Sequence, residues 1–395
     1  MKKVPLVVTL VLLSNVLIGQ SKTIYLKKVL KNLEQIRSAG YFTTSEPWAP
    51  GDTSAAGSYY HYFKEYNNPT DTAIGASFVK LLQEDTTKMT FCYDGAMRAI
   101  VYEAQKYVLI DSFKYNRLSF RPLSPPFFNY TKSIIKYALE TKDSIAIDVK
   151  DLGDSVYFSL AIYGDKQVEF FGKPHYIINP YSPEEISRYE IWISRSNDLP
   201  YKIRREMSHD ISVTACRNIE LNKISIEDFV AWDYFPADYA VKVKGKGNPL
   251  EIKNDLVGKV APDWILNDAD NKTIALKQLK SKVLMIQFTS VSCGPCRASI
   301  SFLKQLVSEY NEKDFDFVSI ESWNRNSMVL KKYQGRNDFN YDFVASTDDV
   351  TRRYQIQAVP VFYILDENRV IRKIVRGYGK ETTDKEIREA INELL

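Results

Sequence analysis

The chain has 395 residues, a formal net charge of +4 at pH 7, and hydrophobic and charged fractions of 45% and 26%. This composition is that of a globular protein and excludes a collagen-like or disordered chain, while the length favours two domains or three small ones. The net charge is small and no basic run with interleaved aromatic residues occurs, so we expect no nucleic-acid partner.

The N-terminus has the pattern of a secretory signal peptide. Lys2 and Lys3 precede an apolar stretch over Val4–Ile18, and the small residue Gly19 follows it. The stretch is shorter than the roughly 20 apolar residues that span a bilayer, although an uncleaved membrane anchor is the alternative. We therefore predict a signal peptide over residues 1–20, export to the periplasm or cell envelope, and a soluble protein after cleavage.

Residues 21–244 predict a mostly antiparallel β binding domain of the α+β class, with a curved sheet and one or two helices. Apolar residues at helical spacing indicate the first helix; they are Leu26, Val29, Leu30, Leu33 and Ile36. After this helix, the dipeptides Asp94-Gly95 and Asn197-Asp198 separate strand-like runs and predict two hairpins.

Two further elements of this domain follow from local patterns. One strand is indicated by apolar residues that alternate with a second set; the apolar residues are Val156, Phe158, Leu160 and Ile162. A short helix is predicted over Ser133–Glu140, after a loop marked by Pro125 and Pro126.

Residues 245–256 are polar and contain glycine, which predicts a linker before a second domain over residues 257–395. In this domain, strands and helices alternate and an antiparallel hairpin follows, the order that an α/β thioredoxin fold requires. The predicted strands are Val283–Thr289, Phe315–Ile320, Val361–Leu365 and Val370–Val375. The predicted helices begin near Cys296, at Ser327, at Asp348, and at a capping box formed by Thr383 and Glu386.

The sequence Cys293-Gly294-Pro295-Cys296 lies between a buried strand and an amphipathic helix. A helix N-terminus presents unpaired N–H groups and a positive dipole, which stabilise a thiolate at Cys293. Gly294 allows a close approach of a substrate backbone, and Pro295 suits a first helical turn. We therefore predict that Cys293 attacks a disulfide and that the more buried Cys296 resolves the mixed disulfide.

Two other chemistries are weighed against this dithiol. Half of a zinc site would need more ligands, but no second Cys-x-x-Cys exists and His61, His175 and His209 lie in the other domain. A peroxiredoxin would carry a proline where Ile286 stands. We therefore expect neither a metal nor a cofactor.

Three segments of the second domain resemble the TlpA/ResA branch of the thioredoxin superfamily. They are Gly258–Trp264, Val283–Arg297 and Ala358–Phe362. The resemblance implies a cis bond between Val359 and Pro360, packed against the cysteines, with the Val359 backbone pairing with an extended client. It also implies client protein disulfides as substrates and a membrane electron donor of the DsbD/CcdA type.

This chain departs from the family pattern at two positions near the motif. Gln287 stands where thioredoxins usually carry a buried aspartate, and a neutral amide cannot accept a proton from Cys296. A proton relay would then run through water or another acid, which makes the Gln287 position and Glu321 the candidate relay positions. Ser292 replaces the aromatic residue that often precedes the first cysteine, which leaves the dithiol more open.

The first domain resembles, over Glu190–Ile203 and in its element order, the LolA/LolB-like lipoprotein-carrier domains. The resemblance implies an apolar or lipoprotein ligand on the concave face, although apolar strand faces are more often plain core. Cys92 and Cys216 of this domain could form a structural disulfide, remain buried and reduced, or receive electrons from the other pair.

Together these features predict an exported thiol–disulfide oxidoreductase that reduces client disulfides, with an N-terminal docking or binding domain. The alternative is a non-enzymatic envelope carrier of lipid or lipoprotein, in which the thioredoxin-like domain is accessory.

Overall fold

The computed structural model describes residues 22–48, 55, 57–103, 106–114, 125–177, 185–207, 210–244, 256–291, 293–325 and 327–395. Ala55 aside, the described residues up to Lys244 form one compact unit and those from Leu256 form a second. The predicted signal peptide and almost all of the predicted linker lie outside the described residues. Within the described ranges, no helix combines the length and the apolar character that crossing a membrane requires.

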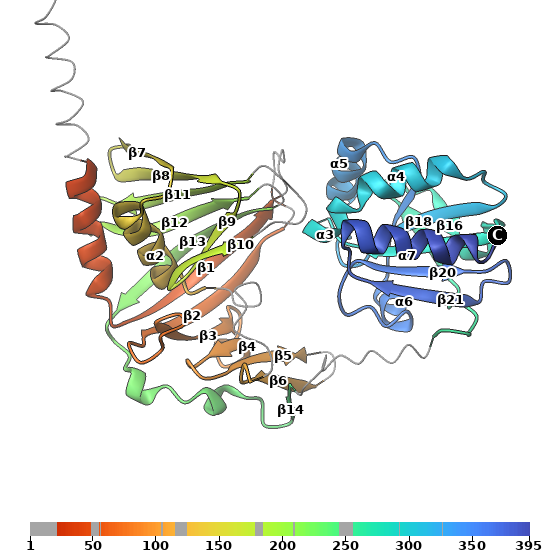
Figure 1. Ribbon diagram of the computed structural model, residues 1–395. Helices are drawn as coiled ribbons and strands as arrows, with labels where there is room; N and C mark the ends of the chain where they lie inside the picture. Colours follow the sequence, from red (N-terminus) through yellow and green to blue (C-terminus); the bar gives the residue numbers. More distant parts are fainter. Residues whose placement is uncertain are drawn as a thin grey trace, which may run out of the picture. The chain divides into compact units, whose positions relative to one another are not determined.

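The first unit is built on a twelve-stranded sheet with the order β14-β6-β5-β4-β3-β2-β1-β13-β12-β11-β8-β7 (Figure 1). Neighbouring strands are antiparallel except β14 and β6, which are parallel. The strands are β1 (Ser38–Trp48), β2 (Tyr59–Asn67), β3 (Ala76–Leu82), β4 (Met89–Tyr93), β5 (Arg98–Tyr102), β6 (Tyr107–Asp111), β7 (Ile145–Asp151), β8 (Ser155–Gly164), β11 (Glu185–Ser194), β12 (Leu199–Glu206), β13 (Ile211–Leu221) and β14 (Ala240–Val243). A separate hairpin consists of β9 (Gln167–Phe171) and β10 (Lys173–Ile177).

Local sequence patterns placed several of these strands correctly. The apolar residues of β8 that were predicted to share one face are all buried. The turn between β4 and β5 contains Gly95 at φ +99°, and the turn between β11 and β12 contains Asp198 at φ +51°. Glycine and aspartate tolerate this left-handed conformation better than most residues, so both hairpin predictions are confirmed.

Two helices supply one apolar core on a single side of the sheet. The first occupies residues 22–34 among those described, and its Leu26, Val29 and Leu33 are buried. The second, α2 (Phe127–Glu140), buries aromatic and aliphatic residues in the same core and contacts β9, β10 and β12. Because these side chains fill the helix-covered face, the structure does not favour carriage of a lipid there.

The helix α2 begins six residues earlier than the predicted Ser133, directly after Pro126. Its first N–H groups are satisfied by distant residues rather than by a local cap. The Phe127 N–H donates to the Tyr41 hydroxyl, and the Phe128 and Asn129 N–H groups donate to the buried Glu65 carboxylate at 3.1 and 2.7 Å. These partners lie on β1 and β2, so sequence periodicity alone could not reveal them.

The two cysteines of this unit lie on opposite faces of the sheet. Cys92 on β4 packs in the far-face core, which the 3-10 helix η3 (Ala231–Tyr234) and its neighbouring residues help to cover. Another 3-10 helix, η2 (Ile226–Asp228), precedes η3. Cys216 on β13 packs in the helix-covered core. Four strand-to-strand steps separate them, roughly 19 Å at the usual spacing, whereas a disulfide joins Cα atoms at most about 7 Å apart. Both are free and buried, so the structural disulfide is excluded.

The second unit has a seven-stranded sheet with the order β16-β15-β19-β18-β17-β20-β21. Its strands are β15 (Ile265–Asp268), β16 (Thr273–Ala275), β17 (Val283–Thr289), β18 (Phe315–Glu321), β19 (Asp342–Ala345), β20 (Val361–Leu365) and β21 (Ile371–Arg376). The helices are η4 (Leu276–Gln278), α3 (Gly294–Ala298), α4 (Ile300–Glu309), α5 (Ser327–Asn337), α6 (Asp348–Arg353) and α7 (Lys380–Asn392). β17, β18 and β19 are parallel, and α4 and α7 cover one face while α6 covers the other.

Of two predicted helix starts in this unit, the one near Cys296 is confirmed and the one at Thr383 is wrong. The helix expected near Cys296 begins at Gly294 and divides at Ser299 into α3 and α4. The capping box at Thr383 and Glu386 does not form, because α7 already begins at Lys380 after Gly379. The Thr383 hydroxyl accepts the Gly379 N–H from inside the first turn, and the Glu386 carboxylate pairs with Lys373 on β21.

Candidate active site

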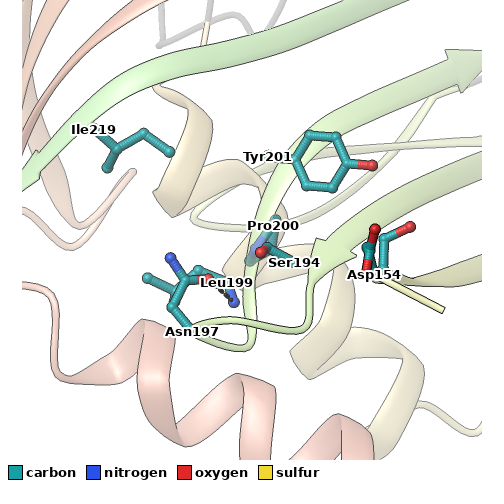
Figure 2. Close-up of a pocket in the computed structure, with 8 residues that line it drawn as sticks. Asp154, Ser194, Asn197, Leu199, Pro200, Tyr201 and Ile219 are labelled. Carbon is teal, nitrogen blue, oxygen red and sulfur yellow. Dashed lines mark hydrogen bonds between the residues drawn. The ribbon is translucent and has the colours of Figure 1, made fainter.

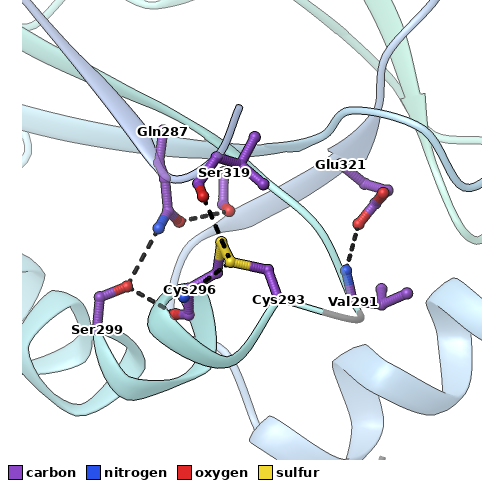
Figure 3. Close-up of a disulfide and its surroundings, with 8 residues drawn as sticks. Gln287, Val291, Cys293, Cys296, Ser299, Ser319 and Glu321 are labelled. Atoms are coloured by element: carbon purple, nitrogen blue, oxygen red, sulfur yellow. Dashed lines mark hydrogen bonds between the residues drawn. A yellow bond between two sulfur atoms is a disulfide. The ribbon is translucent and has the colours of Figure 1, made fainter. Parts of the chain in front are cut away.

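The two cysteines of the motif lie where β17 ends and α3 begins, and they form a disulfide (Figure 3). Cys293 is the N-cap of α3, and its Sγ accepts the Cys296 N–H at 3.1 Å. A buried strand therefore delivers the first cysteine to a helix start, where free N–H groups meet the sulfur. Cys293 is half-buried, whereas Cys296 is only 1% exposed. An incoming disulfide can reach the first sulfur but not the second.

The two residues between the cysteines fit this turn. Pro295 lies in the first turn of α3, where its missing N–H leaves no donor unpaired. Gly294 is the first residue of α3 and is buried. Together they form a compact start of helix that holds the two sulfurs within bonding distance.

A second loop meets the disulfide from the neighbouring strand β20. The Val359–Pro360 peptide bond is cis, as the resemblance implied. The Val359 carbonyl oxygen lies 3.7 Å from Cys293 Sγ, while Pro360 is buried at the start of β20. The Val359 backbone therefore lies beside the disulfide, at the edge of the sheet where β17 ends and β20 begins.

The Gln287 side chain belongs to a buried network behind Cys296. Its carbonyl oxygen accepts the Ser319 hydroxyl at 2.9 Å, and its amide donates to the Ser299 hydroxyl at 3.1 Å. Ser299 in turn donates to the Cys296 carbonyl at 2.7 Å, at the junction of α3 and α4 (Figure 3). The sequence indicated Gln287 but missed both serines, because one lies on β18 and the other follows α3.

The Glu321 carboxylate binds two loops at the ends of β17 and β18. Its oxygens accept the Val291 N–H at 2.7 Å and the N–H groups of Trp323 and Asn324 at 3.0 and 2.9 Å. Burial raises the pKa of this carboxyl group, and the three N–H donors oppose that shift. Figure 3 shows its bond to Val291, on the chain segment that leads to Cys293. This geometry gives Glu321 a positioning role, while the proton relay through Gln287 or Glu321 stays a prediction.

The first unit contains a shallow cavity of about 420 Å³ between the ends of its strands. Figure 2 shows Asn197, Leu199 and Pro200 at the β11–β12 turn, with Asp154 from the turn between β7 and β8. The residues that line this cavity include no cysteine or histidine. Its lining therefore offers no thiol for exchange and combines polar and apolar side chains.

The thiols of this unit are unsuited to exchange. Burial raises the pKa of Cys92 to about 12, with a smaller contribution from Asp94. Burial and the charge of Glu65 raise the pKa of Cys216 well above its usual value. Both thiols therefore stay protonated, and the described structure gives no support for electron transfer to them.

The C-terminal third of the chain is similar to known proteins. The family model described as Redoxin matches residues 256–391. A thiol–disulfide oxidoreductase ResA from Bacillus cereus is 26% identical over 129 residues, which are 32% of this chain and 73% of that protein. The ResA of Oceanobacillus iheyensis is 29% identical over 126 residues, which are 31% of this chain and 65% of that protein.

Solved structures match a similar share of the chain. A structure of a putative thiol:disulfide interchange protein DsbE from Chlorobium tepidum is 19% identical, covers 35% of this chain and 96% of its own, and has a TM-score of 0.33. The thioredoxin domain of a thiol-disulfide oxidoreductase from Bacteroides vulgatus is 20% identical, covers 34% and 98%, and has a TM-score of 0.31. The family model and the ResA relatives make this third of the chain a TlpA/ResA-like domain of the thioredoxin superfamily, an oxidoreductase domain.

Proposed function

We propose that this TlpA/ResA-like domain reduces disulfides of client proteins outside the cytoplasm, through Cys293 and Cys296. One observation carries the proposal: a half-buried sulfur at a helix start, bonded to a buried one, lies beside the Val359 carbonyl. A disulfide needs an accessible attacking thiolate and a resolving thiol within reach, and this pair provides both.

The exchange has two steps in which atoms and electrons balance. The Cys293 thiolate attacks one sulfur of the client disulfide, so that a mixed disulfide forms and the other client sulfur leaves as a thiolate. The Cys296 thiolate then attacks Cys293 Sγ, which forms the Cys293–Cys296 disulfide and releases the second client thiolate. The client gains two electrons and the enzyme dithiol loses two.

The Val359 backbone would hold an extended client strand next to Cys293, with Gly294 and Pro295 leaving the sulfur open to it. Because Gln287 does not titrate, no acid at that position would change its charge while Cys296 attacks the mixed disulfide. Recharging the site needs an external dithiol reductant, and the family resemblance points to a membrane donor of the DsbD/CcdA type. The N-terminal charge and apolar pattern of the chain supports export.

The first unit would act as a docking domain that selects or localises the client. Its helix-covered face is filled with core side chains, so the proposed apolar or lipoprotein ligand has to bind elsewhere on the unit. The solvent-facing side of β8, β11 and β12 offers aromatic side chains beside cations, such as Trp192 under the Lys202 ammonium. This surface suits a protein partner better than an acyl chain.

Covalent trapping tests the proposal on the full chain. With Cys296→Ser, the mixed disulfide on Cys293 cannot be resolved, so we expect covalent client complexes that a reductant releases on a non-reducing gel. The double variant Cys293→Ser/Cys296→Ser is the control and should trap nothing. If the single variant traps no client in cells that make the protein, the proposed reductase function is wrong.

The reduction potential of the full chain decides the direction of exchange. A value near −270 mV, that of thioredoxin, would make the protein a reductase that needs an electron supply. A value near −120 mV would make it an oxidant that forms disulfides, which would contradict the proposed direction. The double serine variant gives the baseline for Cys92 and Cys216.

A further inference from the structure

An exposed tryptophan lies on the loop that follows β18, at the same edge of the sheet as the dithiol. Trp323 is 52% exposed, and it follows β18 by two residues. β17 and β18 are parallel and adjacent, so their carboxyl ends lie next to each other. Cys293 follows the end of β17, which brings the two loops to neighbouring positions.

The loop that carries Trp323 is held firmly at its base. The Glu321 carboxylate accepts the Trp323 and Asn324 N–H groups with one oxygen and the Val291 N–H with the other. Arg325 adds a hydrogen bond to the Ser322 carbonyl at 2.8 Å and an ion pair with Asp348 at 3.1 Å. The same buried carboxylate therefore connects the tryptophan loop to the segment that leads to Cys293.

The order of the strands places the disulfide between two loops. β20, which begins after Val359 and Pro360, is one neighbour of β17, and β18 is the other. A client strand that pairs with the Val359 backbone would run across the carboxyl ends of β17 and β18 and the amino end of β20. Trp323 would then lie on the far side of Cys293 from Val359.

The backbone of Trp323 is held by Glu321 while its ring is exposed, and an indole ring at such a position offers a client a large apolar contact area. The side chain of Met328, near the start of α5, is exposed as well. The chain has Ser292 immediately before Cys293 and so no aromatic ring at that place in the motif. An aromatic contact to a client would therefore come from another loop, such as the one that carries Trp323.

We infer that Trp323 binds an apolar side chain that flanks the client disulfide, and that it thereby sets which disulfides the enzyme prefers. The inference rests on the proposed function and names the kind of substrate: an extended protein segment with an aliphatic or aromatic residue beside its cysteine. Trp323 acts as a specificity residue, and Glu321 positions it.

Two synthetic peptides test this inference on the full chain. They carry the same disulfide and differ only in a leucine or a serine next to one cysteine. The wild-type protein should have a higher kcat/KM for the leucine peptide, and Trp323→Ala should reduce that preference about tenfold, mainly through KM. Trp323→Phe should keep most of it, because the phenyl ring retains the apolar contact.

Three comparisons separate specificity from damage. Trp232→Ala, which removes a tryptophan of similar exposure (55%) from the first unit, should leave the preference unchanged. Oxidised glutathione has no apolar side chain beside its disulfide, so an equal loss of rate on it in Trp323→Ala would mean a disturbed dithiol and would overturn the inference. An unchanged leucine preference would also overturn it. A wild-type protein that reduces none of these disulfides would instead contradict the proposed function itself.

Discussion

The four cysteines divide evenly between the two units, and the two pairs have opposite chemical character. Cys92 and Cys216 lie within strands, surrounded by apolar side chains and far from a helix start. Cys293 lies at the N-terminus of α3, and its sulfur accepts a backbone N–H. The residue type is the same, so the difference teaches that position decides: a thiol at the start of a helix meets N–H groups that favour its thiolate, and a thiol inside an apolar strand does not.

Two buried glutamates extend the comparison. Glu65 in the first unit accepts the Phe128 and Asn129 N–H groups and the Tyr41 hydroxyl, while Glu321 in the second accepts three backbone N–H groups. Burial raises the pKa of both carboxyl groups. The first fixes a helix start inside a packed core, whereas the second fixes loops beside a disulfide. The role of each buried carboxylate therefore depends on which segments its hydrogen bonds hold, because burial raises the pKa of both in the same direction.

Alkylation should produce the largest difference between the two cysteine pairs. Because the pKa of Cys92 is about 12, its thiolate at neutral pH is about a thousandfold scarcer than that of a free cysteine. We expect iodoacetamide to label Cys293 of the native, reduced protein quickly and to leave Cys92 and Cys216 unlabelled, as read by peptide mass spectrometry. Labelling of Cys92 or Cys216 at a rate comparable with Cys293 would break the comparison.

Substitution of the two glutamates should separate stability from reactivity. In Glu65→Gln or Glu321→Gln the new amide group faces an N–H donor, so one bond is lost and the free energy of unfolding should fall by about 1–3 kcal/mol. Only Glu321→Gln should also slow disulfide reduction, by about tenfold, because the segment before Cys293 loses its anchor. Denaturant unfolding and a reduction assay give the two readouts.

Glu34→Gln is the matched control for these variants, since Glu34 is exposed on the first helix. It should change the free energy of unfolding by less than about 0.5 kcal/mol. If a fully folded Glu65→Gln protein reduced disulfides more slowly than the wild type, the expected separation of stability from reactivity would be wrong.

The smallest expected effect is a pH dependence of stability. The folded-state pKa of Glu321 is raised, so its stabilising contribution is fully present below the unfolded pKa of about 4.3 and is lost as pH rises through the folded pKa. Glutamine does not titrate. The free energy of unfolding of the wild type, minus that of Glu321→Gln, should therefore decrease as the pH rises from about 4 through the folded-state pKa. A difference that grows with pH would mean that the N–H donors outweigh burial.

Local patterns predicted those parts of the fold that depend on neighbouring residues. The extent of β17, the turn at Gly95 and the position of the cysteines all follow from short segments. The long-range contacts could not be predicted in this way. Glu65 contacts α2 across more than sixty residues of chain, and Glu321 reaches Val291 across thirty. Such contacts depend on strand order, which no single segment encodes.

The strand order also governs how the chain must mature. Cys92 and Cys216 lie on opposite faces of the finished sheet with three strands between them, so a bond between them is incompatible with that sheet. An unfolded chain has no such barrier, and an oxidant that joined the two thiols early would close a long loop and block assembly. In an oxidising compartment, correct biogenesis therefore requires the first unit to fold before its thiols are oxidised.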